Sequence, residues 1–213
     1  LWDNTTLLKS DIVVSSSGTW SYTLTDALTD ASKHTFKVTS SDANGNTTSF
    51  SNTWTINVDT QAPLAPTLTV TNNNIALVDG VATNVTSPTI SGKGNAENDT
   101  VTVYDNGKLL GTAIVQSDGT WTITLKAPLG EGQHKLTTIE SDPAGNPSPS
   151  TTFTLNIDTT APNAPQVLYA DIVVNSTTTT LVNGGITNVQ NPTLHGSAEA
   201  GTTITLYLNG QPF

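Results

Sequence analysis

An internal repeat is the feature that most constrains how this chain can fold. The segment Asp59–Pro66 recurs about 100 residues later as Asp158–Pro165, with most of its residues unchanged. Upstream of each copy, Gly18-Thr-Trp20 corresponds to Gly119-Thr-Trp121. In the same way, His34 corresponds to His134, Asp42–Asn46 to Asp142–Asn146, Trp54 to Phe153, and Leu77–Ile90 to Leu181–Leu194. The chain is therefore built from copies of one unit of about 100 residues.

The repeat map divides the chain into three segments. Residues 1–60 correspond to the C-terminal part of a first repeat, residues 61–158 to a complete repeat, and residues 159–213 to the N-terminal part of a third. Two explanations are open: the sequence is an excerpt from a longer tandem array, or another chain completes the partial repeats. We favour the excerpt, because half a sandwich leaves strand edges and core surface exposed.

Hydrophobic alternation predicts that the repeat is all-β. Trp121 and Ile123 alternate with Thr residues, and Leu155 and Ile157 alternate with polar residues. This alternation places one face of each strand in a core. Turn signals such as Asp105-Asn-Gly107 separate these runs. We expect strands near 67–71, 75–79, 87–93, 100–105, 108–115, 120–125, 133–141 and 151–157. Short strands at this spacing predict tandem immunoglobulin-like β-sandwich domains arranged as a rod.

Composition and charge exclude several classes of function. The chain has 17 acidic residues and 7 basic residues, all of them Lys, for a net charge of −10. Such an acidic chain lacks the cationic surface that neutralises phosphates, so no nucleic-acid partner is expected. No apolar run is long enough to span a bilayer, so no membrane insertion is expected. Without cysteine, disulfides and thiolate chemistry are impossible.

Several motifs together resemble the bacterial Ig-like repeats of giant secreted adhesins. The motifs are Tyr104-Asp-Asn-Gly107, Asp118-Gly-Thr-Trp121, Asp142–Asn146 and Asp158-Thr-Thr-Ala-Pro162. This group includes the giant non-fimbrial adhesin of Salmonella and large biofilm-associated proteins. The resemblance implies type I secretion, a location at the bacterial cell surface, a role in virulence or biofilm adhesion, and calcium near the domain junctions.

Acidic residues are expected to gather where two such domains meet. In an Ig-type sandwich, the loops between strands B and C, D and E, and F and G lie at the pole where the chain enters, which we call the N-terminal pole. The candidate Ca²⁺ ligands are Asp59, Glu97, Asp99, Asp118 and Asp142 at the junction that precedes the complete repeat, with Asp3 opposite them, and Asp105, Asp158 and Glu199 at the next junction. Clustered carboxylates repel one another, and Ca²⁺, which takes six to eight oxygen ligands, relieves that repulsion. We therefore expect Ca²⁺ to stiffen the junctions, aided by the prolines of each linker.

Some of these acids have a simpler structural explanation. Asp105 and Asp118 lie in Asp-Asn-Gly and Asp-Gly turns, where a carboxylate that caps its own turn is sufficient. Asp142 precedes a proline and is an intermediate case. Asp59, Asp158 and Glu97 follow no such turn pattern, which favours them as ligands.

No arrangement of Ser, His and Asp suggests nucleophilic catalysis, and we expect a protein that is not an enzyme. The leading interpretation is a stalk or spacer segment of a bacterial surface adhesin. Its partners are the neighbouring repeats, and other parts of the parent protein contact the host-cell surface or a glycan. One alternative is a glycan-binding module that uses aromatic residues, although the alternation around Trp20 and Trp121 favours core packing for both. A second alternative is an accessory domain of an extracellular enzyme.

Overall fold

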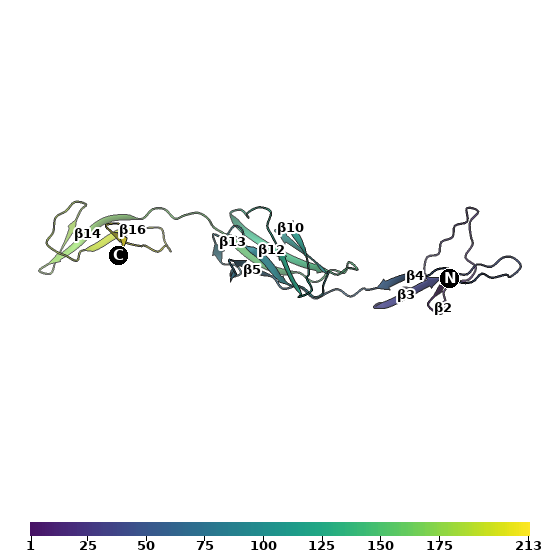
Figure 1. Cartoon of the computed structure of the whole chain (residues 1–213). Coiled ribbons are helices and arrows are strands. Elements are labelled where there is room, and N and C mark those ends of the chain that lie inside the picture. Colours follow the sequence, from purple (N-terminus) through teal and green to yellow (C-terminus); the bar gives the residue numbers. More distant parts are fainter. The chain divides into compact units, whose positions relative to one another are not determined.

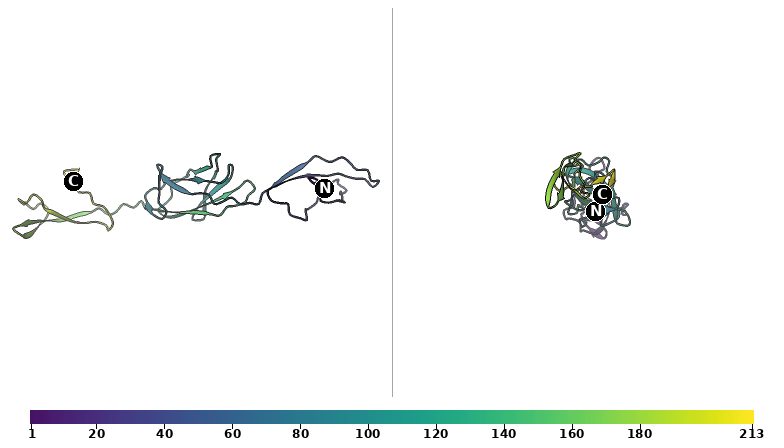
Figure 2. Two further views of the ribbon diagram at one scale, coloured as in Figure 1. Left: turned by 90° about the horizontal axis from the view of Figure 1, so that it is seen from below. Right: turned by 90° about the vertical axis from the view of Figure 1, so that its left-hand side faces the viewer.

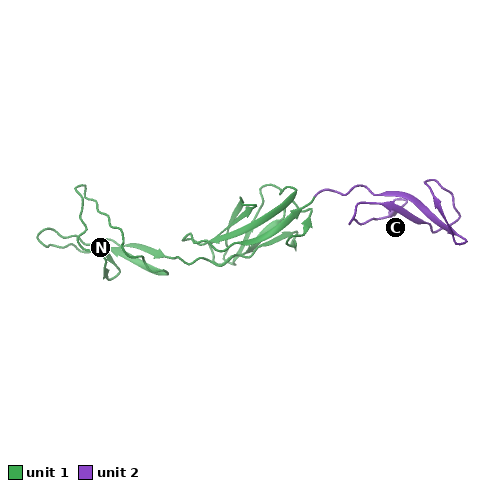
Figure 3. Cartoon of the chain, turned by 180° about the vertical axis from the view of Figure 1, so that it is seen from behind, with its two compact units in different colours: residues 1–158 green, residues 159–213 purple.

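The computed structural model describes all residues from 1 to 213 and contains strands and loops only (Figures 1 and 2). The chain has no helix with the length and apolar character needed to cross a bilayer. Its contacts define two compact units, Leu1–Asp158 and Thr159–Phe213 (Figure 3). The first unit contains three sheets and the second contains two.

The complete repeat forms a sandwich of two sheets within the first unit. One sheet has the order β10-β9-β12-β13-β7, and the other has the order β11-β8-β5-β6. The strands are β5 (Thr69–Asn72), β6 (Ile75–Ala76), β7 (Ala82–Thr83), β8 (Thr89–Lys93), β9 (Thr100–Asp105), β10 (Lys108–Ile114), β11 (Thr120–Ile123), β12 (Gly132–Ser141) and β13 (Thr151–Ile157). All eight strands expected from the alternation are present, and the all-β, immunoglobulin-like class is confirmed.

One strand of the sandwich was not expected from the sequence. β7 has only two residues and pairs in parallel with β13 through Asn156–Ala82 and Ile157–Thr83. Such a short strand carries no alternation of its own, so its pairing depends on the fold around it. The expected hairpin turn after β9 is present, with positive φ at both Asn106 (48°) and Gly107 (81°), as a type I′ turn requires.

The core of the sandwich lies between the two sheets. Trp121, Ile90 and Val70 come from one sheet, and Leu136 and the valines of β9 come from the other. Trp121 is almost fully buried, as its alternation predicts. A small second cluster is formed by Leu129, Leu155 and Ile157.

Residues 1–58 form one sheet with the order β2-β1-β3-β4. Its strands are β1 (Trp2–Asp3), β2 (Thr6–Leu7), β3 (Ser32–Lys37) and β4 (Trp54–Val58). This order is that of β10-β9-β12-β13 in the complete repeat. The prediction that Trp20 packs in a core is wrong for this structure, because nearly half of its surface is exposed. The strands that bury the corresponding Trp121 belong to the half of a repeat that residues 1–58 do not contain.

The second unit contains the opposite half of a repeat. β14 (Gln166–Val174), β15 (Thr177–Leu181) and β16 (Thr193–Ser197) form a sheet with the order β15-β14-β16, which is that of β6-β5-β8. β17 (Tyr207–Leu208) and β18 (Gln211–Pro212) form a separate hairpin. Many apolar side chains of this unit are exposed, among them Val167, Ile186 and Leu194.

Candidate functional site

Two carboxyl groups are buried together at the N-terminal pole of the complete repeat. Glu140 lies on β12, where the alternation of the strand turns Leu136, Thr138 and Glu140 inward, and all three are fully buried. Asp99 immediately precedes β9 and is also buried. The two side chains contact each other, which places two acids of like charge inside the protein.

Neutral hydrogen-bond donors hold Glu140 in position. The backbone N–H of Asn95 donates to Oε1 at 2.6 Å, and the Asn95 side-chain amide donates to Oε2 at 2.9 Å. The same amide also donates to the carbonyl oxygen of Leu64 in the preceding linker, at 2.7 Å. Gly94 permits the close approach, because a Cβ there would lie 3.0 Å from Oε1 of Glu140. These contacts connect the buried carboxylate to the linker.

Burial, together with the neighbouring carboxylates of Glu140 and Asp142, raises the pKa of Asp99 to about 6. Both causes disfavour the charged form of the Asp99 carboxyl. The Asp99 carboxyl therefore keeps its proton to a higher pH than usual, because its charged form would be poorly solvated and close to other acids. A proton at low pH, or a divalent cation at neutral pH, would relieve the repulsion between these acids.

The loop that carries Asp142 has a compact structure of its own. Oδ1 of Asp142 accepts the backbone N–H of Asn146 at 2.9 Å, and Oδ2 accepts the Asn146 amide at 2.8 Å. The hydrogen bonds from Asn146 hold the pKa of Asp142 below its ordinary value. Asp42 and Asn46 form the same pair of bonds in the first segment, at 2.9 and 2.7 Å. This loop is thus a repeated structural element.

The linker at Asp59 is bonded to loops on both of its sides. The Asn146 amide donates to the carbonyl oxygen of Asp59 at 3.1 Å. On the other side, Oδ1 of Asp30 accepts the backbone N–H of Thr60 at 2.6 Å, and Oδ2 accepts the Gln61 amide at 2.8 Å. The bonds from Thr60 and Gln61 lower the pKa of Asp30. The linker therefore has fixed hydrogen-bond partners even though its residues are exposed.

The other predicted ligands have varied surroundings. Asp118 accepts both the N–H (2.9 Å) and the hydroxyl (2.6 Å) of Thr120, in the manner of a turn residue. Asp59 accepts the N–H of Gln61 at 3.0 Å. Glu97 is exposed in the loop beside Asp99. The backbone N–H of Asp158 donates to the carbonyl oxygen of Thr83 at 2.9 Å. Glu199 accepts the backbone N–H of Asn163 at 3.2 Å.

Asp105 and Asp3 are each paired with a histidine. Nδ1 of His134 lies 2.7 Å from Oδ2 of Asp105, and Nδ1 of His34 lies 2.5 Å from Oδ2 of Asp3. Burial lowers the pKa of His134, but the hydrogen bonds to Asp105 and to the Gly130 carbonyl, with the charge of Asp105, outweigh burial and raise it overall. The turn after β9 does not use Asp105 as its cap, because that carboxylate binds the histidine instead.

Of the nine predicted ligands, Asp99 and Asp142 lie near enough for the charge of Asp142 to act on Asp99, and Glu140 contacts Asp99 directly. In this conformation no three His, Asp or Glu side chains are already spaced to hold a metal ion. Sequence reasoning missed Glu140 and Asn95. A signal for Glu140 was present, because an acid that shares strand parity with Leu136 falls on the core face. Its counterpart in the first repeat is Ser40, so the first repeat lacks this buried carboxylate.

Residues 65–159, which make up the complete repeat, match the family described as bacterial Ig-like domain. No curated protein matches the chain.

Among solved structures, the chain is similar to the BSP domain of a biofilm-associated protein, at 25% identity and a TM-score of 0.34 over 61% of this chain and 20% of that one. It is also similar to a complex of the RgpB pro- and mature domains from Porphyromonas gingivalis, at 18% identity and a TM-score of 0.29 over 45% and 19% of the two chains. The chain spans about a fifth of the length of these two solved structures.

Proposed function

We propose that this chain is a stalk segment of a large bacterial surface adhesin, secreted by a type I pathway and exposed outside the cell. In this role the Ig-like repeats separate a distal binding part from the cell surface and carry no catalytic site. The proposal is supported by the near-identical linkers Asp59–Pro66 and Asp158–Pro165, by the match of residues 65–159 to a bacterial Ig-like domain, and by the resemblance to repeats of giant adhesins. A spacer needs repeated domains joined by short, restrained linkers.

Calcium binding at the N-terminal pole of the complete repeat is part of this proposal. The observation that carries it is the buried pair of Asp99 and Glu140, two acids in contact with each other and with no basic side chain named among the causes that shift the pKa of Asp99. Oxygen ligands from carboxylates and carbonyls are those that Ca²⁺ prefers. Asp99, Glu140 and Asp142 would hold the ion, with oxygen atoms of the Asp59 linker as further ligands.

A bound Ca²⁺ would neutralise the carboxylates and favour one arrangement of the linker. The hydrogen bonds of Asp59 and Leu64 to Asn146 and Asn95 supply the physical link, because both amides also bind members of the acidic cluster. Since the cytosol is poor in calcium and the exterior is rich in it, the junction would stiffen only after secretion.

Small-angle scattering of the full chain, first in chelator and then in millimolar Ca²⁺, tests this proposal. We expect a longer maximum dimension and a narrower distribution of shapes with Ca²⁺, together with a higher melting temperature of the complete repeat. The double variant Asp99→Asn/Glu140→Gln should show neither response. If Ca²⁺ leaves both the dimensions and the melting temperature of the unmodified chain unchanged, the calcium role is refuted.

A further inference from the structure

Four side chains form a cluster on the sheet β15-β14-β16 of the second unit. The rings of Tyr169 on β14 and His195 on β16 stack face to face, with 4.6 Å between their centroids and 16° between their planes. Nε2 of His195 lies 3.1 Å from Oδ2 of Asp171. The Thr180 hydroxyl donates to Oδ1 of the same carboxylate at 2.7 Å. We call these four residues the Tyr169 cluster.

The complete repeat shows which face of this sheet is turned to solvent. Val70 on β5 pairs with Ile90 on β8, and both are buried in the core. The neighbouring pair, Thr69 and Ser91, points to the opposite face, because side chains alternate along a strand. Thr69 is exposed, as expected of a residue on the outer face of the sandwich.

The Tyr169 cluster lies on this outer face. Ala170 pairs with Leu194 in the place of the buried pair of the complete repeat. Tyr169 pairs with His195 in the place of the outer pair. Asp171 follows two positions after Tyr169 on β14 and so points to the same side. The cluster is therefore on the solvent side of its sheet, away from the face that corresponds to the core.

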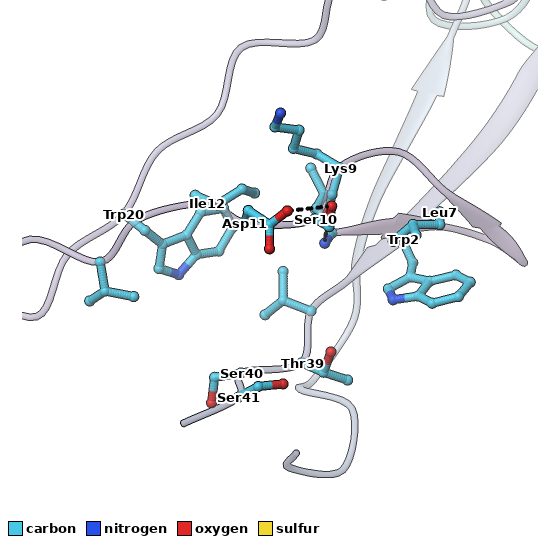
Figure 4. Close-up of a pocket in the computed structure, with 13 residues that line it drawn as sticks. Trp2, Leu7, Lys9, Ser10, Asp11, Ile12, Trp20, Thr39, Ser40 and Ser41 are labelled. Atoms are coloured by element: carbon cyan, nitrogen blue, oxygen red, sulfur yellow. Dashed lines mark hydrogen bonds between the residues drawn. The ribbon is translucent and has the colours of Figure 1, made fainter. Parts of the chain in front are cut away.

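Exposure on the core faces of the partial repeats has no such meaning. Trp20 lines an open cavity of about 370 Å³ in residues 1–58 (Figure 4), and its counterpart Trp121 is buried in the core of the complete repeat. Leu194 is likewise exposed where Ile90 is buried. These surfaces belong to the inside of a repeat, whereas the Tyr169 cluster belongs to its outside.

The complete repeat lacks the cluster. Its four corresponding residues provide neither an aromatic ring nor a charge, and they are Thr69, Thr71, Ala76 and Ser91. The common fold of the repeats does not require a stacked tyrosine and histidine with a buttressed carboxylate, because the complete repeat forms the same pairs of strands without them. The cluster is thus an addition to the outer face of one repeat.

The exposure and chemistry of the cluster match a polar ligand with one apolar face. Tyr169 is 39% exposed, and the side chain of His195 is 37% exposed. The face of an aromatic ring carries negative potential, so C–H groups of a pyranose ring pack favourably on it. A carboxylate accepts hydrogen bonds from hydroxyl groups, and an imidazole can donate or accept them. Asp171 is held in place by the Thr180 hydroxyl, so this acceptor has a defined position beside the rings.

We propose that the Tyr169 cluster is a binding site for an uncharged sugar of the β-galactoside type. The sugar packs its C–H face on the Tyr169 ring, and its hydroxyl groups bond to Asp171 and His195. A galactoside fits because its axial hydroxyl leaves one face of the ring formed by C–H groups. Anionic sugars are disfavoured, because Asp171 is a carboxylate and the chain has a net charge of −10. This goes beyond the stalk role, since a repeat of the stalk then contacts glycans itself.

An NMR titration of the full chain with lactose in chelator tests the site without involving calcium. We expect saturable shifts of the Tyr169, Asp171 and His195 amides, with a Kd on the order of a millimolar for so open a site. 3′-Sialyllactose, which adds a negative charge beside the galactose, should bind more weakly than lactose. Absence of saturable shifts in the cluster up to about 100 mM lactose would overturn the proposal.

Two replacements restore residues of the complete repeat. Tyr169→Thr removes the aromatic platform and Asp171→Thr removes the acceptor, and each should weaken lactose binding by about tenfold or more. Threonine has a high β propensity and suits an outward-facing strand position, so β14 should keep its pairing. Tyr207→Thr, which changes another exposed tyrosine of the same unit, is the control and should bind lactose like the unmodified chain. Undiminished binding by Tyr169→Thr would mean that the platform is elsewhere.

The complete repeat allows the cluster to be built on a second sheet. The changes Thr69→Tyr, Thr71→Asp, Ala76→Thr and Ser91→His are made together in the Tyr169→Thr background, which removes the original site. Lactose should then shift the amides of the four new residues and no longer those of β14. If this variant is folded, as shown by dispersed amide resonances, and lactose causes no shifts at the new residues, these side chains do not form a sugar site and the proposal is wrong.

Discussion

The carboxyl groups of Asp99 and Glu140 lie against each other at the N-terminal pole of the complete repeat, and both residues are buried. Two buried acids of like charge destabilise the folded state near neutral pH unless a proton or a cation compensates them. The hydrogen bonds from Asn95 keep Glu140 in place, so the pair does not separate readily. This arrangement makes the stability of the repeat depend on its ionic surroundings.

Replacing Asp99 with Asn should stabilise the complete repeat in chelator at pH 7. The amide keeps the size of the side chain, removes one negative charge and can donate to Glu140. We expect a gain on the order of 1–2 kcal/mol, observed as a rise of several degrees in melting temperature. The same variant should lose the stabilisation that Ca²⁺ gives to the unmodified chain. Thermal unfolding with and without Ca²⁺ measures both effects.

Asp118→Asn is the matched control for this prediction. Asp118 is an acid of the same pole, but it accepts bonds from Thr120 within its own turn. Its replacement should cost no more than about 1 kcal/mol and leave the calcium response intact. An equal calcium response in the Asp99 and Asp118 variants would contradict the assignment of Asp99 as a ligand.

The stability of the repeat in chelator should fall as pH rises from about 4 to about 6, and should fall further above the ordinary histidine pKa of 6.5 as His134 loses its proton. The pKa of Asp99 is about 6 in the folded chain and about 3.9 in an unfolded one, so the folded state binds more protons in this window. The raised pKa of His134 also makes stability fall with rising pH. The stabilisation that the protonated histidine contributes is lost as pH rises through the pKa of His134 in the folded chain. Denaturant midpoints at several pH values measure the slope, and Asp99→Asn should flatten it.

Much of the fold follows from residues that are neighbours in sequence. The alternation around Trp121 and Ile123 and the Asn106–Gly107 turn are local signals, and the structure contains the strands and the turn that they predict. β7 could not be predicted, because its two residues become a strand only through β13, more than 60 residues away. Local pattern therefore predicts strands well and their long-range pairing poorly.

The candidate site was only partly predictable for the same reason. The sequence placed Asp99 and Asp142 at one pole through the loop order of an Ig-type sandwich. It could not show that Glu140 turns inward to meet Asp99, because that contact joins two separate parts of the repeat. Asp105 shows the opposite case: its turn suggested a local cap, but its partner is His134 on another strand.

Asp30→Ala should release the linker from the loop that precedes it. The variant removes the acceptor of the Thr60 N–H and of the Gln61 amide. We expect faster hydrogen exchange of the Thr60 amide and greater backbone motion at residues 59–61, measured by NMR, with little change in the melting of the complete repeat. Asp26→Ala changes a nearby exposed acid and should leave the exchange of Thr60 unchanged. Similar protection of Thr60 in both variants would rule out Asp30 as a restraint on the linker.

His134→Gln should destabilise the complete repeat, because the Asp105 carboxylate loses its charged partner in a largely buried place. The expected loss is about 1–3 kcal/mol. It should be larger at pH 6 than at pH 8, since the raised pKa makes the protonated histidine the stabilising form. His195→Gln, in the second unit, is the control and should not change the unfolding of the complete repeat. A loss that is independent of pH would mean that packing alone explains the effect.

Gly94→Ala tests whether the close approach of the loop to Glu140 is required. An added Cβ would lie 2.4 Å from a methyl group of Val115 and 3.0 Å from Oε1 of Glu140, so the loop or the β12 side chain must shift. We expect a loss of about 1–3 kcal/mol in chelator, together with weaker Ca²⁺ stabilisation, because the shift displaces a proposed ligand. Gly130→Ala adds the same methyl group where no atom lies within 4 Å, and it should leave both the stability and the calcium response nearly unchanged. Thermal unfolding of the two variants with and without Ca²⁺ makes the comparison. Equal behaviour of the two would mean that the pole is loose enough to accommodate the methyl group, and that Glu140 is not held in a defined position there.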